Sequence, residues 1–359
     1  MTMEPGIYFG LPESDYHADP AFSASGAKNM LISPLTYWIN SPLNPDHKEE
    51  DTETDSKIAG KAFHTRILEG QAVFDQRYAI KPDPDDYPEA IAGGDALRKL
   101  CESYDLKKSG SIAEMCERIL EVDPIVELWP VIIAEFEASA EGRIILKSRL
   151  ANEIKRHARI VEMHEDAKKA FVGGFPEVSI FWIDTETGIR MKARVDYLKV
   201  RAAVDLKTFA NQMSVPLEIA VGRAVANYRY HIQGVVYCEA VERAKEMYRA
   251  QGAASVFGES PEKAWLDAFA EPKPHAFVFV FLESGNVPNA VVREFRQTET
   301  YAQMGASTNN YWSAGFSGYR LALDQYKRCT DHYEPGLPWV DPQPMRPFVD
   351  EDFPIYMME

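Results

Sequence analysis

Three strand-like segments follow one another between residues 177 and 208, and this run constrains the fold more than any other feature of the chain. Residues 177–184 are rich in β-branched and aromatic side chains, and the next few residues, Thr185-Glu186-Thr187-Gly188, form a turn signal. Residues 189–198 and 202–208 have the composition of two further strands. Because so few residues separate the segments, we predict an antiparallel meander.

Two acidic residues and a lysine lie on the second and third of these segments. Asp205 and Lys207 are two residues apart, so in a strand they project to the same side. If the two segments pair as a hairpin, Asp196 lies almost opposite Asp205. Two carboxylates and an ammonium group then converge, which suits a hard divalent cation and a cationic donor beside a phosphate. An ordinary acidic–basic pair on a solvated strand face has the same sequence, so both interpretations stay open here.

Helical segments lie on both sides of the meander. Residues 215–244 read as one long helix, on which Gln233 and Tyr237 are four apart and share a face. Upstream, residues 58–68 look helical and carry His64 among small and apolar side chains. A histidine in that setting is either a core residue or a ligand.

In combination, these residues resemble the PD-(D/E)XK nucleases of the RecB/RecE type, and the nuclease domain of RecE is the nearest likeness. The likeness rests on Gly60 with His64, Glu177, Asp196, the run Asp205-Leu206-Lys207-Thr208, and Gln233 with Tyr237. The opening of the chain is similar too, in Gly6-Ile7-Tyr8, Tyr16-His17, Phe22-Ser23-Ala24-Ser25-Gly26, Ser33-Pro34 and Tyr37. Residues 5–70 and 172–250 carry most of the resemblance.

This resemblance implies a fold and a division of the chain. The expected fold is α/β (α+β), with a restriction-endonuclease-like core in which helices flank a central mixed sheet. We expect the core in residues 1–81 and 126–359 and a small helical insert in residues 82–125.

The resemblance also implies roles for individual residues. The catalytic residues would be Asp196, Asp205, Lys207 and His64, and the metal ligands His64, Asp196, Asp205 and the backbone carbonyl of Leu206. Lys207 would orient or help deprotonate the attacking water and stabilise charge on the phosphate. The residues implied to contact substrate are Gln233, Tyr237 and Glu177. Glu177 either lies near the metal or pairs with a neighbouring basic residue. Mg²⁺ is the expected cofactor, and Mn²⁺ is expected to substitute because it accepts an imidazole ligand.

The insert reads as two short amphipathic helices within residues 96–120. Ser111 and Glu114 form the capping-box pattern that starts the second helix. The segment resembles a SAP-type module, in which Lys107, Lys108 and Arg118 would bind DNA, although Ile112 stands where a lysine is usual. The alternative is a helical hairpin that packs on the nuclease. We expect residues 121–171 to be helical and to lead back to the core.

The net charge of −16, from 55 acidic and 39 basic residues, has the wrong sign for a general nucleic-acid-binding protein. A nuclease escapes this objection if its positive charge is concentrated along the DNA. Basic residues do cluster in the segment 143–169, as Arg143, Lys147, Arg149, Lys155, Arg156, Arg159, Lys168 and Lys169. The alternative is that they only form a solvated helix face.

The remaining features bear on cofactors, location and the C-terminal part. Cysteines 101, 116, 238 and 329 are widely spaced, so we expect no disulfide framework, no iron–sulfur cluster and a cytoplasmic location in a bacterial host cell. We find no signal peptide and no stretch of membrane-spanning length, and we expect no membrane partner. Strands are expected at 275–283 and 290–296, and a long helix at about 298–331.

The function implied by the resemblance is a Mg²⁺-dependent DNA exonuclease, in a phage or prophage setting. It would digest linear double-stranded DNA 5′→3′ from its ends and leave 3′ overhangs for recombination by a single-strand annealing protein. The resemblance also implies a homo-oligomer, with a ring as one form. Two alternatives stay open, namely a metal-dependent endonuclease of the same fold and a catalytically silent DNA-binding or assembly protein.

Overall fold

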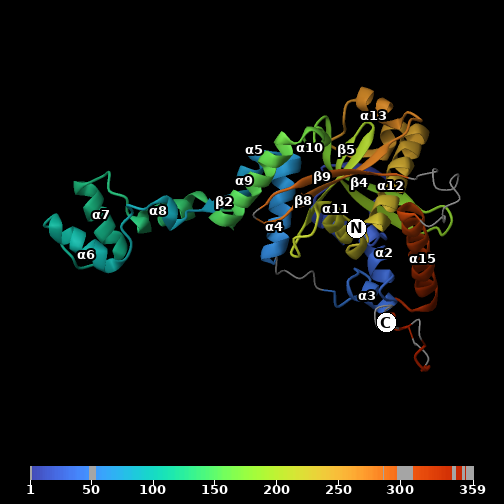
Figure 1. Cartoon of the computed structure of the whole chain (residues 1–359), viewed down its shortest axis with the longest axis horizontal. Coiled ribbons are helices and arrows are strands. Elements are labelled where there is room, and N and C mark those ends of the chain that lie inside the picture. Colours follow the sequence, from blue (N-terminus) through green and yellow to red (C-terminus); the bar gives the residue numbers. More distant parts are fainter. Residues whose placement is uncertain are drawn as a thin grey trace.

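A mixed sheet forms the centre of the molecule in the computed structural model, which describes residues 2–47, 54–285, 287–296, 310–341, 345–349 and 352. In these residues seven strands join in the order β7-β1-β4-β5-β6-β8-β9. The strands are β1 (Gly6–Phe9), β4 (Gly174–Ile183), β5 (Arg190–Lys199), β6 (Ala202–Phe209), β7 (Val256–Gly258), β8 (Ala276–Glu283) and β9 (Ala290–Phe295). The expected mixed sheet flanked by helices is confirmed (Figure 1).

The meander β4–β5–β6 is antiparallel throughout, as the sequence predicted. β6 then pairs in parallel with β8, which requires a crossover connection, and helices supply it. β8 and β9 are antiparallel neighbours, so the two C-terminal strands expected at 275–283 and 290–296 are confirmed. β6 is therefore a central strand, flanked by β5 and β8.

Helices cover both faces of the sheet. In β6 and β8, Ala203 and Phe279 belong to the large core that α12 and α15 complete, whereas Leu206 and Val280 belong to a second core. Strand side chains alternate between faces, so these two cores lie on opposite sides of the sheet. The helices that cover the first face include α2 (Ala24–Met30), α3 (Pro34–Ile39), α12 (Tyr230–Gln251), α13 (Lys263–Ala270) and α15 (Tyr311–His332), and those of the second include α9 (Ser148–Met163) and α10 (Glu165–Ala170).

The single helix predicted for residues 215–244 is wrong. The chain forms α11 (Leu217–Asn227) and α12, which are separated at Arg229, where φ is +51°. A left-handed residue cannot continue a right-handed helix, so the chain changes direction there. The two glycines of this segment, Gly222 and Gly234, lie inside the helices and do not break them.

Short helices make up the N-terminal part of the chain. Ser23 caps α2 by accepting a hydrogen bond from the Gly26 N–H at 3.2 Å. The helix expected at 58–68 is present as α4 (Asp55–His64), and it continues directly into a π-helical turn, η1 (Thr65–Glu69). The remaining short elements are α1 (Glu13–Ala18), α5 (Gln71–Arg77), η2 (Pro84–Asp86) and η3 (Gly252–Ser255).

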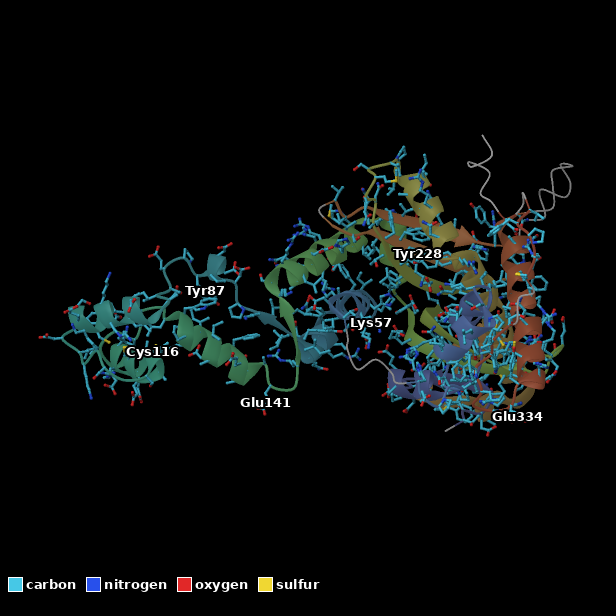
Figure 2. All side chains as sticks on the ribbon, turned by 90° about the horizontal axis from the view of Figure 1, so that it is seen from below. Lys57, Tyr87, Cys116, Glu141, Tyr228 and Glu334 are labelled. Carbon is cyan, nitrogen blue, oxygen red and sulfur yellow. The ribbon has the colours of Figure 1, made fainter. Side chains whose placement is uncertain are left out.

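The insert projects from the body of the molecule and does not pack on the sheet (Figure 1). Its helices are α6 (Gly94–Ser103) and α7 (Ile112–Val122), and the capping box of α7 is formed as predicted. A third helix, α8 (Trp129–Ser139), follows beyond the boundary expected at residue 125. A separate small core, which includes Cys101 and Cys116, holds α6 against α7. Figure 2 shows Cys116 in this distal part, well away from Tyr228 on the body.

A two-stranded parallel ladder connects the insert to the body. β2 (Tyr78–Lys81) pairs with β3 (Ile144–Lys147), so the chain leaves and re-enters the body side by side. The expectation that residues 121–171 are helical throughout is therefore wrong at β3. Because Ile144, Ile145 and Leu146 are apolar and mostly β-branched, the segment suits a strand.

α15 confirms the described part of the helix expected at 298–331, and residues 297–309 lie outside the described residues. In the part of the chain that the structure describes, no helix combines the length and the apolar character that crossing a membrane requires.

A buried ion pair attaches α15 to the sheet, and we predict that breaking it destabilises the fold. The Arg320 guanidinium donates to the Asp184 carboxylate at 2.7 Å, and Asp184 is only 1% exposed. Arg320→Met leaves that carboxylate without its cation and should lower the free energy of unfolding by about 2–3 kcal/mol. Urea denaturation measures this change. Arg328→Met, at an exposed position of the same helix, is the matched control and should stay within about 0.5 kcal/mol of the wild type.

Candidate active site

The registers of two neighbouring ladders place three carboxylates in one row across β4, β5 and β6. The β4–β5 ladder skips one position, where Glu177 faces Asp196. The β5–β6 ladder ends at the pair Tyr197–Val204, so the next position brings Asp196 opposite Asp205. The hairpin pairing inferred from the sequence is confirmed.

The backbone is irregular in this row. Glu177 has a φ of +53°, in the left-handed region that non-glycine residues seldom adopt. On β5, Val195 and Leu198 are three residues apart yet enter the same core, although strict alternation would send them to opposite faces. The alternation of side chains between the two faces of β5 is therefore interrupted near Asp196. The row of acidic residues lies at this interruption, between two regular parts of the strand.

Asp196 lies between the other two acids. Its Oδ2 atom accepts a hydrogen bond from the Leu206 N–H at 2.7 Å, which ties β5 to β6 beyond the end of their ladder. Burial, together with the negative charge of Asp205, raises the pKa of Asp196 to about 7, while His64 and Lys207 act in the opposite direction. Asp196 thus has a carboxylate whose charge is poorly compensated.

Asp205 is fully buried and has one oxygen that lacks a well-directed hydrogen bond. Its Oδ1 accepts from Gln233 Nε2 at 2.7 Å. Its Oδ2 lies 2.7 Å from Lys207 Nζ but receives no hydrogen bond of acceptable geometry. Burial alone would lower the pKa of Lys207, but Asp205 and Asp196 raise it above its usual range.

His64 and Glu177 form the more open side of the site. The His64 Nδ1 atom is 3.9 Å from both Asp196 Oδ2 and Glu177 Oε1. Burial lowers the pKa of His64, but the two carboxylates outweigh this effect and raise it. The His64 and Glu177 side chains are 31% and 28% exposed, whereas the Asp205 side chain is 0% exposed, so the site opens to solvent beside α4.

Glu177 also pairs with a basic neighbour, which was one of its two expected roles. Arg194 Nε donates to Glu177 Oε2 at 2.6 Å. Burial raises the pKa of Glu177, but His64 and Arg194 lower it by a larger amount, so the net shift is downward.

Gln233 and Tyr237 come from α12 and lie under the site. Gln233 is 8% exposed and holds Asp205 through its amide nitrogen. Tyr237 packs edge-on against Phe277 with ring centroids 5.9 Å apart, and burial raises its pKa well above the usual value. In this arrangement Gln233 orients a carboxylate, and Tyr237 borders the acidic row.

The three basic residues singled out in the insert lie far from this row (Figure 1). Arg118 donates to the carbonyls of Lys107, Ser109 and Glu114, so its guanidinium closes the α6–α7 connection. Lys108 pairs with Glu102 at 2.7 Å.

Sequence reasoning missed two residues beside Asp205. Lys28, from α2, donates to Gln233 Oε1 at 3.3 Å. Tyr230, the first residue of α12, lies beneath the ammonium groups of both Lys28 and Lys207. The available signal was weak, since it was only that Lys28 is the single charged residue of α2.

The donor atoms of this row fit a hard divalent cation in chemical type. Two carboxylates, an imidazole and the Leu206 carbonyl offer oxygen and nitrogen ligands, and Asp205 Oδ2 has capacity to spare. Among the residues described, no three His, Cys, Asp or Glu side chains are already arranged around a common metal position. A cation would therefore take over part of the contact that Asp205 now makes with Lys207.

A family of known sequences agrees with this reading of the fold. The sequence profile of a family described as "PDDEXK-like domain of unknown function (DUF3799)" matches residues 46–264. A crystal structure from Eubacterium rectale, described as a putative exonuclease, is similar over 96% of this chain and 96% of that chain, with 14% sequence identity and a TM-score of 0.45. No curated protein matches the chain significantly.

The poorly compensated carboxylate of Asp196 predicts an unusual dependence of stability on pH when divalent cations are removed with EDTA. A folded-state pKa raised to about 7, above the ordinary aspartate value of 3.8, makes the folded protein lose stability as the pH rises from about 4 to 7. Asp196→Asn cannot ionise and should be more stable than the wild type at pH 8 by at least about 1 kcal/mol, but not at pH 4. Urea denaturation at the two pH values tests this expectation.

The exposed Asp324 provides the control for that measurement. Asp324→Asn should leave the pH dependence of stability as it is in the wild type. If Asp196→Asn also left it unchanged, the carboxylate of Asp196 would not carry the cost inferred for it.

Proposed function

The chain belongs to the PDDEXK-like family whose profile matches residues 46–264, and from this premise we propose that it is a Mg²⁺-dependent deoxyribonuclease that acts as an exonuclease on linear double-stranded DNA. One observation carries the proposal. Asp205 is completely buried, keeps an oxygen without a well-directed hydrogen bond, and has Asp196 and Lys207 beside it. A buried acid pair with a lysine serves no evident purpose in packing, since burying charge is costly.

His64, Asp196, Asp205 and the Leu206 carbonyl would hold the metal ion. When bound, Mg²⁺ supplies a Lewis acid that activates water and neutralises charge on the phosphate, and Mn²⁺ is proposed to substitute for it. The fit is supported by the uneven compensation of charge in the row, because two neighbouring buried carboxylates repel one another until a cation joins them.

Residues of the chain itself orient the two carboxylates and donate a hydrogen bond to the substrate. The Leu206 N–H fixes the direction of the Asp196 carboxylate, and the Gln233 amide does the same for Asp205. The Lys207 ammonium can donate a hydrogen bond to a phosphoryl oxygen, where it stabilises the negative charge that develops as the bond to the leaving oxygen breaks.

A basic helix face supports DNA as the substrate despite the negative net charge. α9 contacts η1, the turn that directly follows His64. Its outer face presents basic side chains that make no ion pair with the residues described, namely Arg149, Lys155, Arg156 and Arg159. Such a face suits the phosphate backbone, which attracts lysine and arginine irrespective of sequence.

The finer points of the proposal come from the resemblance to RecE-type nucleases. These are 5′→3′ digestion, 3′ overhangs for recombination, an annealing protein as partner and a homo-oligomer that could encircle DNA. They need experiments of their own, beginning with the dependence on a DNA end.

Linear and circular duplexes distinguish the proposed activity from its alternatives. We expect digestion of linear duplex in Mg²⁺, none in EDTA, and resistance of covalently closed circular DNA. Asp205→Asn and Lys207→Met should each lower the rate by about 100-fold or more, because a charge that stabilises the transition state is lost. Asp267→Asn, at an exposed position, is the control and should keep full activity.

Each other outcome has a distinct meaning. Cleavage of the circle at the same rate would indicate an endonuclease, and DNA binding without cleavage would indicate a silent relative. Full activity in Asp205→Asn would refute the site. With end-labelled duplex, loss of the 5′ label first is the expected polarity, and loss of the 3′ label first would reverse it.

The basic face of α9 generates a separate prediction. Charge reversal at two of its exposed positions, Lys155→Glu with Arg156→Glu, should raise KM for DNA by roughly tenfold and lower the slope of log KM against log salt by about two. The same double reversal at Lys327 and Arg328 on α15 is the matched control, because the net charge changes equally. An equal effect in both variants would mean that only net charge matters.

A further inference from the structure

Among the residues described, Lys28 makes no direct contact with a carboxylate. Its side chain is half-buried, and its ammonium group donates to the neutral amide oxygen of Gln233 at 3.3 Å. Within the described residues, no carboxylate oxygen lies within 4.0 Å of this ammonium group, whereas Lys207 and Lys245 each have such a partner. A partly buried ammonium without a counter-ion is costly.

A second positive charge makes this arrangement more costly. Lys28 Nζ and Lys207 Nζ lie 5.2 Å and 5.3 Å from the centroid of the Tyr230 ring. The ring's negative face attracts both cations but compensates them only in part. Burial first, and then the charge of Lys207, lower the pKa of Lys28 to about 8, while the charge of Asp205 acts in the opposite direction.

The surrounding structure holds Lys28 in this position. Its helix packs closely, since a Cβ atom at Gly26 would lie 3.0 Å from the Tyr37 ring. The backbone carbonyl of Lys28 also accepts a hydrogen bond from Arg229 Nη1 at 3.5 Å. Arg229 itself is the left-handed residue that separates α11 from α12. The break that the sequence did not predict is thus the feature that brings Tyr230 beneath the two lysines.

Gln233 links Lys28 to the acidic row. Its amide nitrogen donates to Asp205, and its amide oxygen accepts from Lys28. The two ends of one side chain therefore contact a carboxylate proposed to bind metal and an ammonium without a counter-ion. An anion beside Lys28 would lie next to the position at which Lys207 meets a phosphate.

Resting on the nuclease activity proposed above, we propose that Lys28 is a substrate-binding residue that holds a second phosphate of the DNA strand, adjacent to the phosphate that Lys207 contacts. The phosphate would be the direct counter-ion that Lys28 lacks among the described residues. Successive phosphates along a strand carry one negative charge each, which matches two lysines over one aromatic ring. Lys28 thus extends the site from the cleaved bond to a neighbouring nucleotide.

Steady-state cleavage of linear duplex by three variants tests this inference. Lys28→Met removes the charge and keeps the chain length, so KM should rise about tenfold while kcat stays within about threefold, and the slope of log KM against log salt should fall by about one. Lys28→Arg should restore most of the affinity. Lys263→Met, at an exposed position on α13, is the control and should match the wild type.

Thermal unfolding separates binding from a structural role. Because Lys28→Met removes an uncompensated charge, its Tm should equal or exceed that of the wild type. A lower Tm with an unchanged KM and salt slope would overturn the inference and make Lys28 a structural residue.

The inference and the proposed activity fail in different ways. An active wild type with an unaffected Lys28→Met variant rejects the role of Lys28 alone. A wild type without activity on DNA removes the premise, and the inference with it.

Discussion

The hydrogen bond from the Leu206 N–H to the Asp196 carboxylate is the interaction on which the rest of the site depends. It joins β5 to β6 at 2.7 Å, just beyond the point where their regular ladder ends. In this row the Leu206 N–H therefore bonds to a side chain instead of to the neighbouring strand. This bond fixes the Asp196 carboxylate between Glu177 and Asp205. In a buried setting such neighbours repel one another, so the row is stable only because cationic and amide groups surround it.

Those compensating groups come from separate parts of the fold. Lys207 lies two residues after Asp205 on the same strand, His64 ends α4, and Gln233 and Lys28 come from α12 and α2. Glu177 has Arg194 as a counter-ion and Asp205 has Lys207, whereas burial and the charge of Asp205 leave the pKa of Asp196 raised to about 7. Charge is therefore unbalanced in two places. The acidic row has too little positive charge, and Lys28 has a positive charge without a carboxylate in contact with it. A metal ion and a phosphate backbone would correct both.

The sequence predicts those parts of the fold and site that depend on residues close together along the chain, and it does not predict those that depend on distant residues. The meander follows from local composition and short turns, and its register, which brings Asp196 towards Asp205, follows from the period of two in a strand. The break at Arg229 has no such signal, because its left-handed backbone is imposed by packing between α11, α12 and α2. For the same reason the contact of Lys28 with Gln233, which are 205 positions apart, could not be predicted from composition or periodicity. Family resemblance suggested the proposed role of His64. It did not indicate that the site opens to solvent on the side where His64 lies.

The central claim is that Asp196 and Asp205 share a divalent cation, and binding of Mn²⁺ measured by electron paramagnetic resonance tests it without any substrate. Free Mn²⁺ gives a strong signal that weakens on binding, so titration yields the affinity directly. We expect saturable binding by the wild type that Mg²⁺ displaces, and loss of that binding in Asp196→Asn and in Asp205→Asn with the fold retained. Equal Mn²⁺ affinity in the wild type and both variants would contradict it.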